Sequence, residues 1–462
     1  MSSRPNRRRF LSTAAATAVV PLLAWPARAQ MSPDEVDVAI VGAGAAGIAA
    51  ARRIAASGRS YAVFEASARL GGRIWSDTGR LGVLHDRGAQ RISASGRNPL
   101  VSLGRLAGLP LYEPTRFRRL QVGLREARDS EYDDFTAAVR RSQRAIAAAG
   151  EAGVDMPAAR ALPDLRDWRE TVAFVLGPLS RSKDLDEIST VDFARAEDQP
   201  DELICRSGMS WLLATAAIPV SVKRDAAVTR VDSRGRDALT LDTERGAERA
   251  RAVIVTVSTN VLAEERIRFD PPLGARTRNA IAALSLGTRD RLLFELPGNP
   301  FSLADDQRLV FKSESARMVA LTGRVGGGDL AVADFSGRFG AGISREGEAA
   351  MKAFVSELLA DHFGADARKR IGRSEAVHWS REPWILGGVS AAAPGQGASR
   401  RILGEPVHDR IFFAGEAVHE SWFGTVAGAW VSGERAADQA LAFLARPAAS
   451  PAPARPAAKR RK

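Results

Sequence analysis

The sequence predicts an α/β fold that is divided between two domains, and three observations support this prediction. The chain has 462 residues, which exceeds the size of one ordinary hydrophobic core. Hydrophobic residues make up 45% of the chain and charged residues 26%, as in soluble globular proteins. Short apolar runs followed by small-residue turns and helical patterns stand near both ends, which is typical of parallel strands joined to helices.

The first strand leads into a glycine-rich turn. Residues 36–41 are apolar apart from Asp37, residues 42–47 read Gly-Ala-Gly-Ala-Ala-Gly, and residues 48–57 form an Ala-rich helical stretch. A second strand, residues 60–64, ends at Glu65. This order predicts a Rossmann-like domain of the GxGxxG type. Its glycines allow a tight turn, close approach to a pyrophosphate and helix–strand packing, and its acid accepts ribose hydrogen bonds. A βαβ unit without a ligand is the alternative. The residues assigned to the nucleotide are Gly42, Gly44, Ala45, Ala46, Gly47 and Glu65.

The stretch after this unit narrows the identity of the nucleotide. Residues 65–73 read Glu-Ala-Ser-Ala-Arg-Leu-Gly-Gly-Arg. They resemble the E-A-x-x-R-x-G-G-R signature of the flavin-containing amine oxidase superfamily, which includes monoamine, polyamine and L-amino-acid oxidases. The resemblance implies an FAD-binding domain of the glutathione-reductase type, with Ala66, Gly71, Gly72 and Arg73 at the FAD diphosphate. Two glycines admit the backbone closely, and Arg73 offers a forked donor to phosphate oxygens. A surface turn is the alternative.

Three further segments resemble parts of the same cofactor site. Residues 410–416 are an apolar strand that ends in Gly-Glu, and residues 422–429 are a small-residue turn that opens a helix. In the family, the glutamate contacts the ribityl chain and the helix start points at the flavin ring. Residues 86–92 match the segment beneath the flavin, and a backbone contact near Val228 holds the adenine in relatives. The positions implied by these segments are Gln90, Arg91, Val228, Glu416, Thr425 and Val426.

The expected substrate side departs from the family. Arg291 stands where relatives have the lysine that holds a water near flavin N5, which argues against rapid reaction of reduced flavin with oxygen. Trp422 is predicted to form one aromatic wall of the substrate site, whereas Val389 stands where relatives have the opposite tyrosine. Trp384 is a nearby aromatic residue that could contribute to the site; in the alternative interpretation it packs in the core. Arg91 matches the arginine with which L-amino-acid oxidases bind the substrate carboxylate. The Arg-rich composition is the alternative explanation of both arginines. We take Arg291, Trp422, Arg91 and Trp384 as the candidate catalytic residues.

The cysteine content bears on how the flavin is held. The cysteine that carries covalent flavin in some relatives would align with Gly388, so the resemblance implies non-covalent FAD. Cys205 is the single cysteine of the chain, and it is predicted to be a buried small residue. One cysteine and five histidines offer no metal-ligand pattern, so no metal is predicted.

The net charge of +12 is concentrated at the two ends of the chain. Residues 1–29 carry five Arg and residues 446–462 carry six Arg or Lys, with no acid in either, which leaves +1 for the rest. No nucleic-acid partner is therefore expected. Residues 1–29 resemble a twin-arginine (Tat) signal, with Arg7-Arg8, an apolar run too short to span a bilayer and an Ala-Arg-Ala cleavage site. We expect a periplasmic or secreted protein without a stable membrane anchor.

These segments predict the domain organisation. The FAD-binding domain takes residues 34–95, 206–285 and 376–445. A discontinuous α+β substrate-binding domain takes residues 96–205, which are expected to be mainly helical, and residues 286–375. The tail at 446–462 is rich in Ala, Pro and Arg and is predicted to be disordered.

The predicted function is FAD-dependent oxidation of a C–N bond in an amine or an L-amino acid. Hydride passes to flavin N5, the imine hydrolyses to a carbonyl product and ammonia, and O2 or an electron-carrier protein reoxidises the flavin. Two alternatives stay open. A flavin desaturase acting on C–C bonds shares the fingerprint, and a non-catalytic FAD-binding accessory protein would explain Arg291 and Val389.

Overall fold

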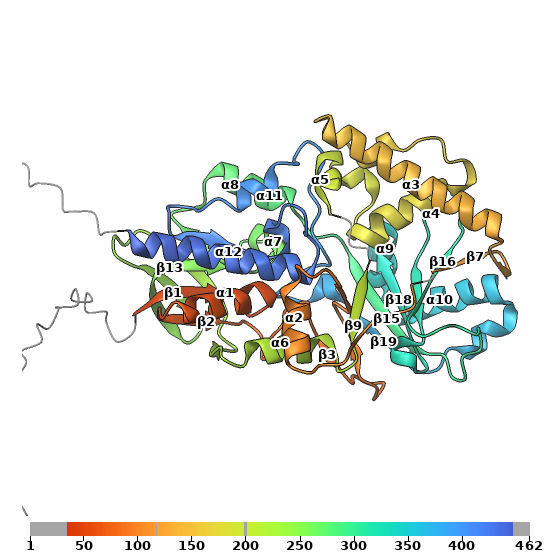
Figure 1. Ribbon diagram of the computed structural model, residues 1–462, viewed down its shortest axis with the longest axis horizontal. Helices are drawn as coiled ribbons and strands as arrows, with labels where there is room; N and C mark the ends of the chain where they lie inside the picture. The colour runs from red at the N-terminus through yellow and green to blue at the C-terminus, as the bar shows by residue number, and fades with distance from the viewer. Residues whose placement is uncertain (1–34, 117, 198–200, 447–462) are drawn as a thin grey trace, which may run out of the picture. The chain divides into compact units, whose positions relative to one another are not determined.

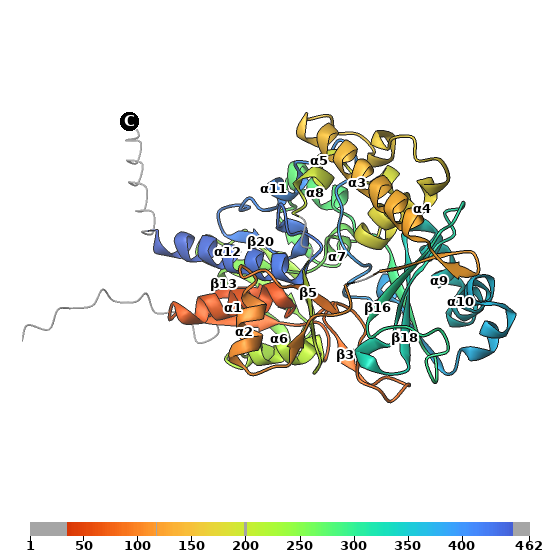
Figure 2. The same ribbon diagram turned by 45° about the vertical axis from the view of Figure 1, so that its right-hand side comes forward.

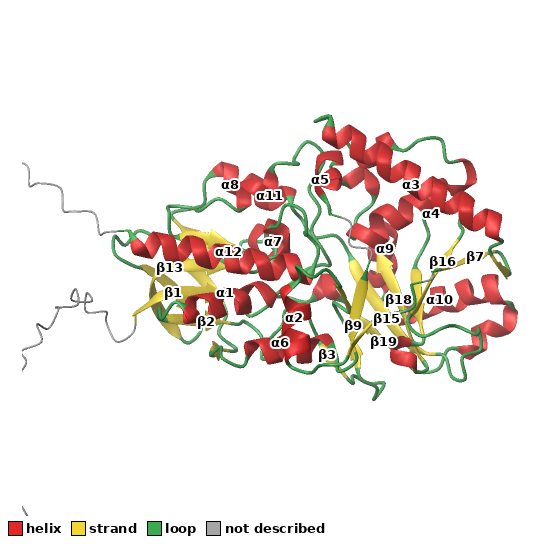
Figure 3. Ribbon diagram, in the orientation of Figure 1, coloured by secondary structure: helices red, strands yellow, loops and turns green. Residues whose placement is uncertain are grey.

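A computed structural model of the chain describes residues 35–116, 118–197 and 201–446 (Figure 1). The predicted signal peptide, residues 1–29, and the predicted tail beyond Arg446 lie outside the described residues. Helices and strands are mixed along the described chain, which confirms an α/β fold (Figure 3). Within the described residues, no helix combines the length and the apolar character needed to cross a membrane.

The first main sheet has eight strands. They are β1 (Glu35–Val41), β2 (Tyr61–Phe64), β10 (Val222–Lys223), β11 (Val228–Asp232), β12 (Leu239–Thr243), β13 (Gly246–Val255), β14 (Arg268–Asp270) and β20 (Ile411–Phe413). The order is β10-β2-β1-β13-β12-β11-β14, and β20 also pairs with β13. β1 is parallel to both β2 and β13, and β20 is parallel to β13. The carboxyl ends of β1, β2, β13 and β20 therefore meet at one edge, where the glycine-rich turn begins.

Helices cover both faces of this sheet because its central strands are apolar on both sides. α1 (Ala45–Ala56), α12 (Val426–Ala445), α2 (Pro99–Leu106) and α6 (Met209–Ala217) pack over the face that carries Val38 and Ile40. The opposite face, with Ala39 and Val41, is covered by residues of α7 (Thr259–Ala263), α8 (Ala275–Ala283) and α11 (Ser399–Leu403). α1 and α12 lie side by side in both ribbon views (Figures 1 and 2). A Cβ on Gly433 of α12 would lie 2.1 Å from the Ala46 carbonyl oxygen, so these two helices approach closely there.

The second main sheet has seven strands, and buried apolar residues stand on both of its faces. Its strands, in spatial order, are β19 (Ser374–Val377), β15 (Arg289–Glu295), β18 (Leu330–Ser336), β17 (Ala320–Gly323), β16 (Gln307–Phe311), β7 (Arg119–Val122) and β8 (Arg125–Glu126). Leu292, Phe294 and Phe335 pack on one face against α9 (Gly337–Glu346) and α10 (Glu348–Phe363). Because side chains alternate along a strand, Arg291 and Asp334 lie on the opposite face.

Residues 96–205, which the sequence predicts to be mainly helical, contain several helices and a few short strands. They contain the helical group α3 (Asp129–Glu151), α4 (Arg169–Phe174) and α5 (Thr190–Arg195). They also contain β7, β8 and two strands of a small sheet formed by β5 (Arg91–Ser93), β9 (Glu202–Cys205) and β6 (Leu111–Tyr112). A separate hairpin pairs β3 (Ser76–Asp77) with β4 (His85–Asp86). Strand β7 was missed because it is four residues long and its partner, β16, lies far along the chain.

Each main sheet is assembled from separate stretches of chain. The eight-stranded sheet takes strands from residues 35–64, 222–270 and 411–413, and the seven-stranded sheet takes strands from 119–126, 289–336 and 374–377. The chain therefore passes back and forth between the two sheets. The exact domain boundaries stay a prediction.

Candidate active site

A cavity of about 510 Å³ is lined by residues from both main sheets. One part, which we call the glycine-lined arm, is bounded by residues 42–46, 65–74 and 415–429. The other part, which we call the arginine-lined arm, is bounded by five arginines and two carboxylates: Arg91, Arg118, Arg289, Arg291, Arg308, Glu202 and Asp334. The two arms belong to one continuous cavity, so a molecule in the first arm can contact a molecule in the second.

Nearly all residues predicted to bind the cofactor line this cavity. They are Gly42, Gly44, Ala45, Ala46, Glu65, Ala66, Gly71, Gly72, Arg73, Gln90, Arg91, Val228, Glu416, Thr425 and Val426. Gly47 does not line the cavity and is buried in the first turn of α1. A Cβ on Gly47 would lie 1.9 Å from the Gly42 carbonyl oxygen, so a larger residue would separate the helix from the turn.

Two glycine-rich segments lie against each other at the start of α1. Gly44 and Gly71 form a parallel bridge, and the Gly71 amide donates to the Ala43 carbonyl oxygen over 3.0 Å. Gly71 has a φ of 107°, which a residue with a side chain rarely adopts. The space beside the α1 N-terminus is therefore bounded by backbone instead of side chains, and its free amides suit a diphosphate.

Glu65 stands at the end of β2 with its carboxylate already partly occupied. Oε2 accepts from the Ala43 amide over 2.9 Å, and Oε1 accepts from the Ser67 amide and hydroxyl over 2.9 and 2.8 Å. A carboxylate has about four acceptor sites. The protein uses three, so room for a ribose hydroxyl is left on Oε2.

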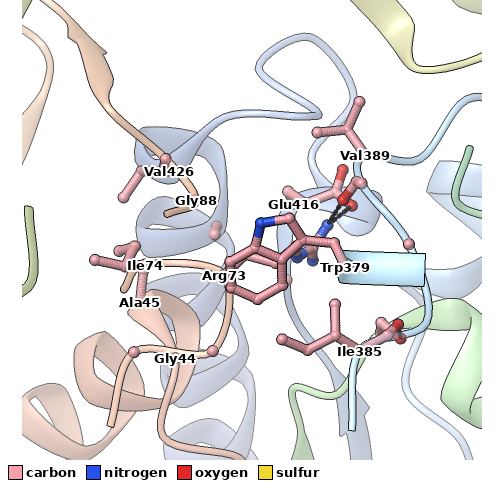
Figure 4. A pocket seen from close by; sticks show the side chains of 18 of the residues that line it. Gly44, Ala45, Arg73, Ile74, Gly88, Trp379, Ile385, Val389, Glu416 and Val426 are labelled. Carbon is pink, nitrogen blue, oxygen red and sulfur yellow. Dashed lines mark hydrogen bonds and ion pairs between the residues drawn. The ribbon is translucent and has the colours of Figure 1, made fainter. Parts of the chain in front are cut away.

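Arg73 and Glu416 form an ion pair at the junction of the arms (Figure 4). Arg73 Nη1 donates to Glu416 Oε1 over 2.8 Å and to the Gly388 carbonyl oxygen over 2.6 Å. Glu416 also accepts from the Ser390 hydroxyl over 2.7 Å, from the Ser390 amide over 3.2 Å and from the Gly424 amide over 2.8 Å, which makes four donors in all. Burial opposes ionisation, but Arg73 and Arg400 hold the pKa of Glu416 below its usual value. Glu416 is thus saturated by protein donors and acts as a positioning residue that fixes three segments of the cavity wall.

The N-terminus of α12 also faces the cavity. The Thr425 hydroxyl caps this helix by accepting from the Gly428 amide over 2.9 Å. Thr425, Val426 and Ala427 line the glycine-lined arm. Ala45, Ile74 and Val426 stand on one side of the cavity, whereas Trp379, Ile385 and Val389 stand on the other (Figure 4). A flat ring system fits between such apolar walls, and the first amides of α12 present a positive dipole end to its edge.

Arg291 is buried and tied to the protein on two sides. Its Nε donates to Asp334 Oδ1 on the neighbouring strand over 2.9 Å, and its Nη1 donates to the Gly88 carbonyl oxygen. Burial opposes ionisation of Asp334, yet Arg291 and Arg289 hold its pKa below the usual value. Arg291 therefore stays a fixed cation at the wall, and its carboxylate partner stays charged.

The predicted aromatic walls are only partly present. Trp384 and Trp379 line the cavity. Trp422 is not among the lining residues; its Nε1 donates to Glu197 over 2.6 Å, and its ring stacks on His419 with 5.4 Å between centroids. The side chain of Trp422 therefore points away from the cavity, although Phe423 and Gly424 follow it directly in the closing motif.

Asp86, in the hairpin behind Arg291, should make the stability of the protein depend on pH. Burial raises the pKa of Asp86 to about 6, despite hydrogen bonds from Ser76 and the Met209 amide. The folded state therefore binds this proton more tightly than the unfolded state, and the associated stability is lost as pH rises from about 4 to about 6. Asp86→Asn should remove this loss and raise the free energy of unfolding at pH 7.5 by about 1–3 kcal/mol.

Urea unfolding at pH 4, 6 and 7.5 measures this effect. Asp361→Asn, which changes an exposed carboxyl on α10, is the matched control and should leave the pH profile unchanged. An Asp86→Asn profile that is parallel to that of the unaltered protein would contradict the interpretation.

Structure reveals site residues that sequence reasoning did not identify. Arg118, Arg289 and Arg308 line the arginine-lined arm, and Asp192 and Arg400 form a buried pair behind Ser390. For Arg289, a sequence signal was available: Arg289 and Arg291 alternate with Asp290 and Leu292 along β15, so the two arginines lie on one face of the strand. No group of three or more His, Cys, Asp or Glu suited to a metal ion occurs in the part of the chain that the structure describes.

Comparisons with known proteins assign the family. The model of the flavin-containing amine oxidoreductase family matches residues 45–441. Lysine-specific histone demethylase 1B of Mus musculus is 24% identical over 444 residues, which cover 88% of this chain and 53% of that protein. Lysine-specific histone demethylase 1 homolog 1 of Oryza sativa subsp. japonica is 26% identical over 439 residues, which cover 87% and 52%. The chain spans about half the length of these relatives.

Two solved structures share the fold. Wild-type putrescine oxidase bound to putrescine superposes with a TM-score of 0.74 at 22% identity, covering 88% of this chain and 99% of that chain. Cyclohexylamine oxidase from Brevibacterium oxydans IH-35A superposes with a TM-score of 0.73 at 22% identity, covering 90% and 100%. The chain belongs to the flavin-containing amine oxidoreductase family. The family model describes flavin-containing oxidoreductases of amines.

The residues present fit FAD as the cofactor. The backbone cradle at Gly44 and Gly71 suits the diphosphate, and the gap between the apolar walls suits the ring. Cys205 is buried in β9 and is not among the lining residues, so no thiol stands at the cavity for a covalent link. FAD is therefore bound non-covalently.

Proposed function

We propose that the enzyme oxidises the C–N bond of a small amine or L-amino acid, with FAD in a Rossmann-like GxGxxG site. The observation that carries this proposal is the single cavity in which a glycine-lined arm opens into an arginine-lined arm. When bound, FAD would supply the hydride acceptor for oxidation of the carbon next to the amine nitrogen, and water would hydrolyse the oxidised amine to a carbonyl compound and ammonium. The protein residues supply position, dryness and charge.

The arginine-lined arm favours the neutral form of an amine. Its five guanidinium groups outnumber its two carboxylates, so an ammonium placed there would be repelled and its pKa lowered. Asp334 is paired with Arg291, and Glu202 is paired with Arg91 over 2.9 Å. These carboxylates are therefore committed to arginines and hold no proton for the reaction. Loss of the amine proton to solvent before oxidation is sufficient, because hydride leaves from carbon and not from nitrogen.

The apolar wall opposite α12 keeps water from the reacting carbon. Trp379 is buried, its Nε1 donates to the Arg87 carbonyl oxygen over 2.9 Å, and its ring meets Trp75 edge to face with 6.2 Å between centroids. These contacts lock the ring in place. A rigid apolar wall orients the substrate and lowers the local dielectric, which strengthens the electrostatic effects of the arginines.

The charge of the arginine-lined arm favours this reaction over the desaturase alternative. A desaturase acting on C–C bonds needs an apolar arm, whereas this arm carries seven ionisable side chains. The reaction of reduced flavin with O2 is a separate point. Arg291 replaces the lysine found in relatives and is fixed by Asp334. We propose that O2 reacts slowly and that another acceptor reoxidises the flavin.

An anaerobic reduction assay tests the proposal. Purified protein should show a flavin spectrum, and its absorbance near 450 nm should bleach with some member of a panel of amines and L-amino acids. Peroxide formation and dye reduction, read separately, distinguish an oxidase from a dehydrogenase. Flavin that no amine or amino acid reduces would support the non-catalytic alternative.

We also propose export through the Tat pathway, on the basis of Arg7-Arg8 and the Ala-Arg-Ala sequence at residues 27–29. Changing both arginines to lysine should retain the protein in the cytoplasmic fraction. Equal export of the altered and unaltered chains would contradict this localisation.

A further inference from the structure

The arginine-lined arm is built on one face of the seven-stranded sheet. Arg291 on β15 pairs in register with Asp334 on β18, and Arg308 on β16 pairs with Thr322 on β17. Arg118 directly precedes β7, the strand that pairs with β16 on its other side. All of these side chains line the same cavity. The sheet therefore presents a band of guanidinium groups on neighbouring strands, where like charges repel one another.

This band carries an excess of three positive charges. Arg91, Arg118, Arg289, Arg291 and Arg308 stand against Glu202 and Asp334. The rest of the described lining contains arginine–carboxylate pairs such as Arg73 with Glu416. Like charges held together in a partly enclosed space are costly, so their excess indicates a bound anion.

Two of the arginines have clearly unmet donors. Arg118 has no hydrogen bond or ion pair with the residues that the structure describes, and burial lowers its pKa. Arg289 Nη2 donates to the Leu179 carbonyl oxygen, but its Nε is buried without a partner. A buried guanidinium with unmet donors is unfavourable unless a ligand supplies the acceptors.

The third arginine is only weakly paired. Arg308 contacts Glu202 at 3.4 Å, a carboxylate that also accepts from Arg91. Burial and the neighbouring guanidinium groups of Arg91 and Arg118 lower the pKa of Arg308 to about 10. Arg118, Arg289 and Arg308 are therefore the residues with the most capacity left for an anion.

Arg91 is the residue that the sequence assigned to a single substrate carboxylate. Its Nη1 donates to Glu202 and its Nη2 to the Asp306 carbonyl oxygen, both over 2.9 Å. One carboxylate on Arg91 would leave the capacity of Arg118, Arg289 and Arg308 unused. The excess of three charges accommodates a dianion.

We propose that the substrate is an amine bearing two carboxylates, an acidic α-amino acid, and that Arg118, Arg289 and Arg308 bind one of these carboxylates. This inference rests on the proposed function, because it names the substrate class of the same cavity. The guanidinium groups match carboxylate geometry with paired donors. A diamine such as putrescine would place a second cation against the band, which disfavours it.

The binding test uses the FAD-loaded protein with two acids that carry no C–N bond and one diamine, which is measured on the oxidised protein before any reduction of the flavin. Binding is measured as a change in the flavin spectrum. Glutarate, a dicarboxylate, should bind at least tenfold more tightly than the monocarboxylate butyrate, and 1,4-diaminobutane should bind more weakly than either. Raising the salt concentration should weaken glutarate more than butyrate, because two charges are involved. Tighter binding of the diamine than of glutarate would overturn the inference.

Arg118→Gln supplies the matched variant. Because Arg118 has no partner among the residues that the structure describes, its loss leaves no described group orphaned, and the fold should be retained; Arg308→Gln is the second variant. Each should weaken glutarate binding about tenfold. Arg105→Gln, which removes an exposed arginine on α2, is the control and should bind glutarate like the unaltered protein. Unchanged glutarate affinity in both Arg118→Gln and Arg308→Gln would also overturn the proposal.

Substrate pairs separate this inference from the proposed function. L-glutamate and L-aspartate should reduce the flavin at least tenfold faster, at low concentration, than L-glutamine and L-asparagine. Reduction by neutral or cationic amines alone would leave amine oxidation standing and overturn the acidic substrate. Glutarate binding without reduction by any amine or amino acid would overturn the proposed function and, with it, the assignment of a substrate.

Discussion

Gly44→Val is expected to give a folded protein that purifies without flavin. Gly44 has φ −76° and ψ −173°, an extended backbone that valine adopts readily. A Cβ at this position would meet only the Gly71 carbonyl oxygen, at 3.8 Å, so it points into the cavity and not into the core. The valine methyl groups would occupy the space beside the α1 N-terminus that the diphosphate needs.

The ratio of absorbance at 450 nm to absorbance at 280 nm measures flavin content, and circular dichroism reports the fold. We expect at least a tenfold fall in the flavin ratio with little change in the spectrum of the fold. Gly274→Val is the matched control because Gly274 is exposed, has no positive φ and has open space around it. A yellow Gly44→Val protein with a full complement of flavin would show that the glycine-lined arm is not the diphosphate site.

The glycine-lined arm was predictable because its parts are local in sequence. The turn at residues 42–47 and the glycines at 71–72 carry backbone requirements that few residues meet, and Glu65 contributes a carboxylate that accepts hydrogen bonds from Ala43 and Ser67. These requirements survive changes in the rest of the chain. A sequence pattern can therefore specify which residues line this arm, although it does not show that Glu416 is saturated by protein donors.

The arginine-lined arm was not predictable, because its members come from strands that pair at long range. Arg118, Arg289 and Arg308 meet only when β7, β15 and β16 join one sheet. In a chain with 66 Lys and Arg residues, no single arginine stands out. The face on which each arginine lies depends on register, and a shift of one residue would reverse it.

Trp422 shows a different limit of motif reasoning. The closing motif places residues 424–427 at the cavity, but it does not fix the direction of neighbouring side chains. Trp422 turns to Glu197, which follows α5, because its indole N–H needs an acceptor when buried. Proximity in sequence to a site is therefore weaker evidence than a backbone requirement.

Asp192→Ala should cause the largest loss of stability among the substitutions considered. Asp192 and Arg400 are each 1% exposed and form two hydrogen bonds, of 2.7 and 2.9 Å. Burial opposes ionisation, but Arg400 holds the pKa of Asp192 below its usual value. Removal of the carboxylate leaves the Arg400 charge buried and unpaired, which costs about 3–5 kcal/mol in the free energy of unfolding.

The effect should reach the cofactor as well as the fold. Arg400 Nη1 donates to the Ser390 hydroxyl over 2.9 Å, and that hydroxyl donates to Glu416 over 2.7 Å. The buried pair thus connects α5 to the carboxylate that positions Arg73. We therefore expect weaker flavin retention in the folded fraction of Asp192→Ala, measured by flavin release during dialysis at a temperature where the protein stays folded.

Two comparisons distinguish a buried pair from ion pairing in general. Glu405→Ala breaks the exposed pair with Arg276, whose side chains are 43% and 61% exposed, and should cost less than about 1 kcal/mol. Because the pKa of Asp192 is depressed, its contribution to stability is present at neutral pH and is lost as pH falls through the folded pKa. The difference in free energy of unfolding between the unaltered protein and Asp192→Ala should therefore narrow in acid. If urea unfolding shows equal losses in the free energy of unfolding for Asp192→Ala and Glu405→Ala, water reaches Arg400. The hydrogen bonds that connect α5 to Glu416 would then contribute nothing measurable to stability.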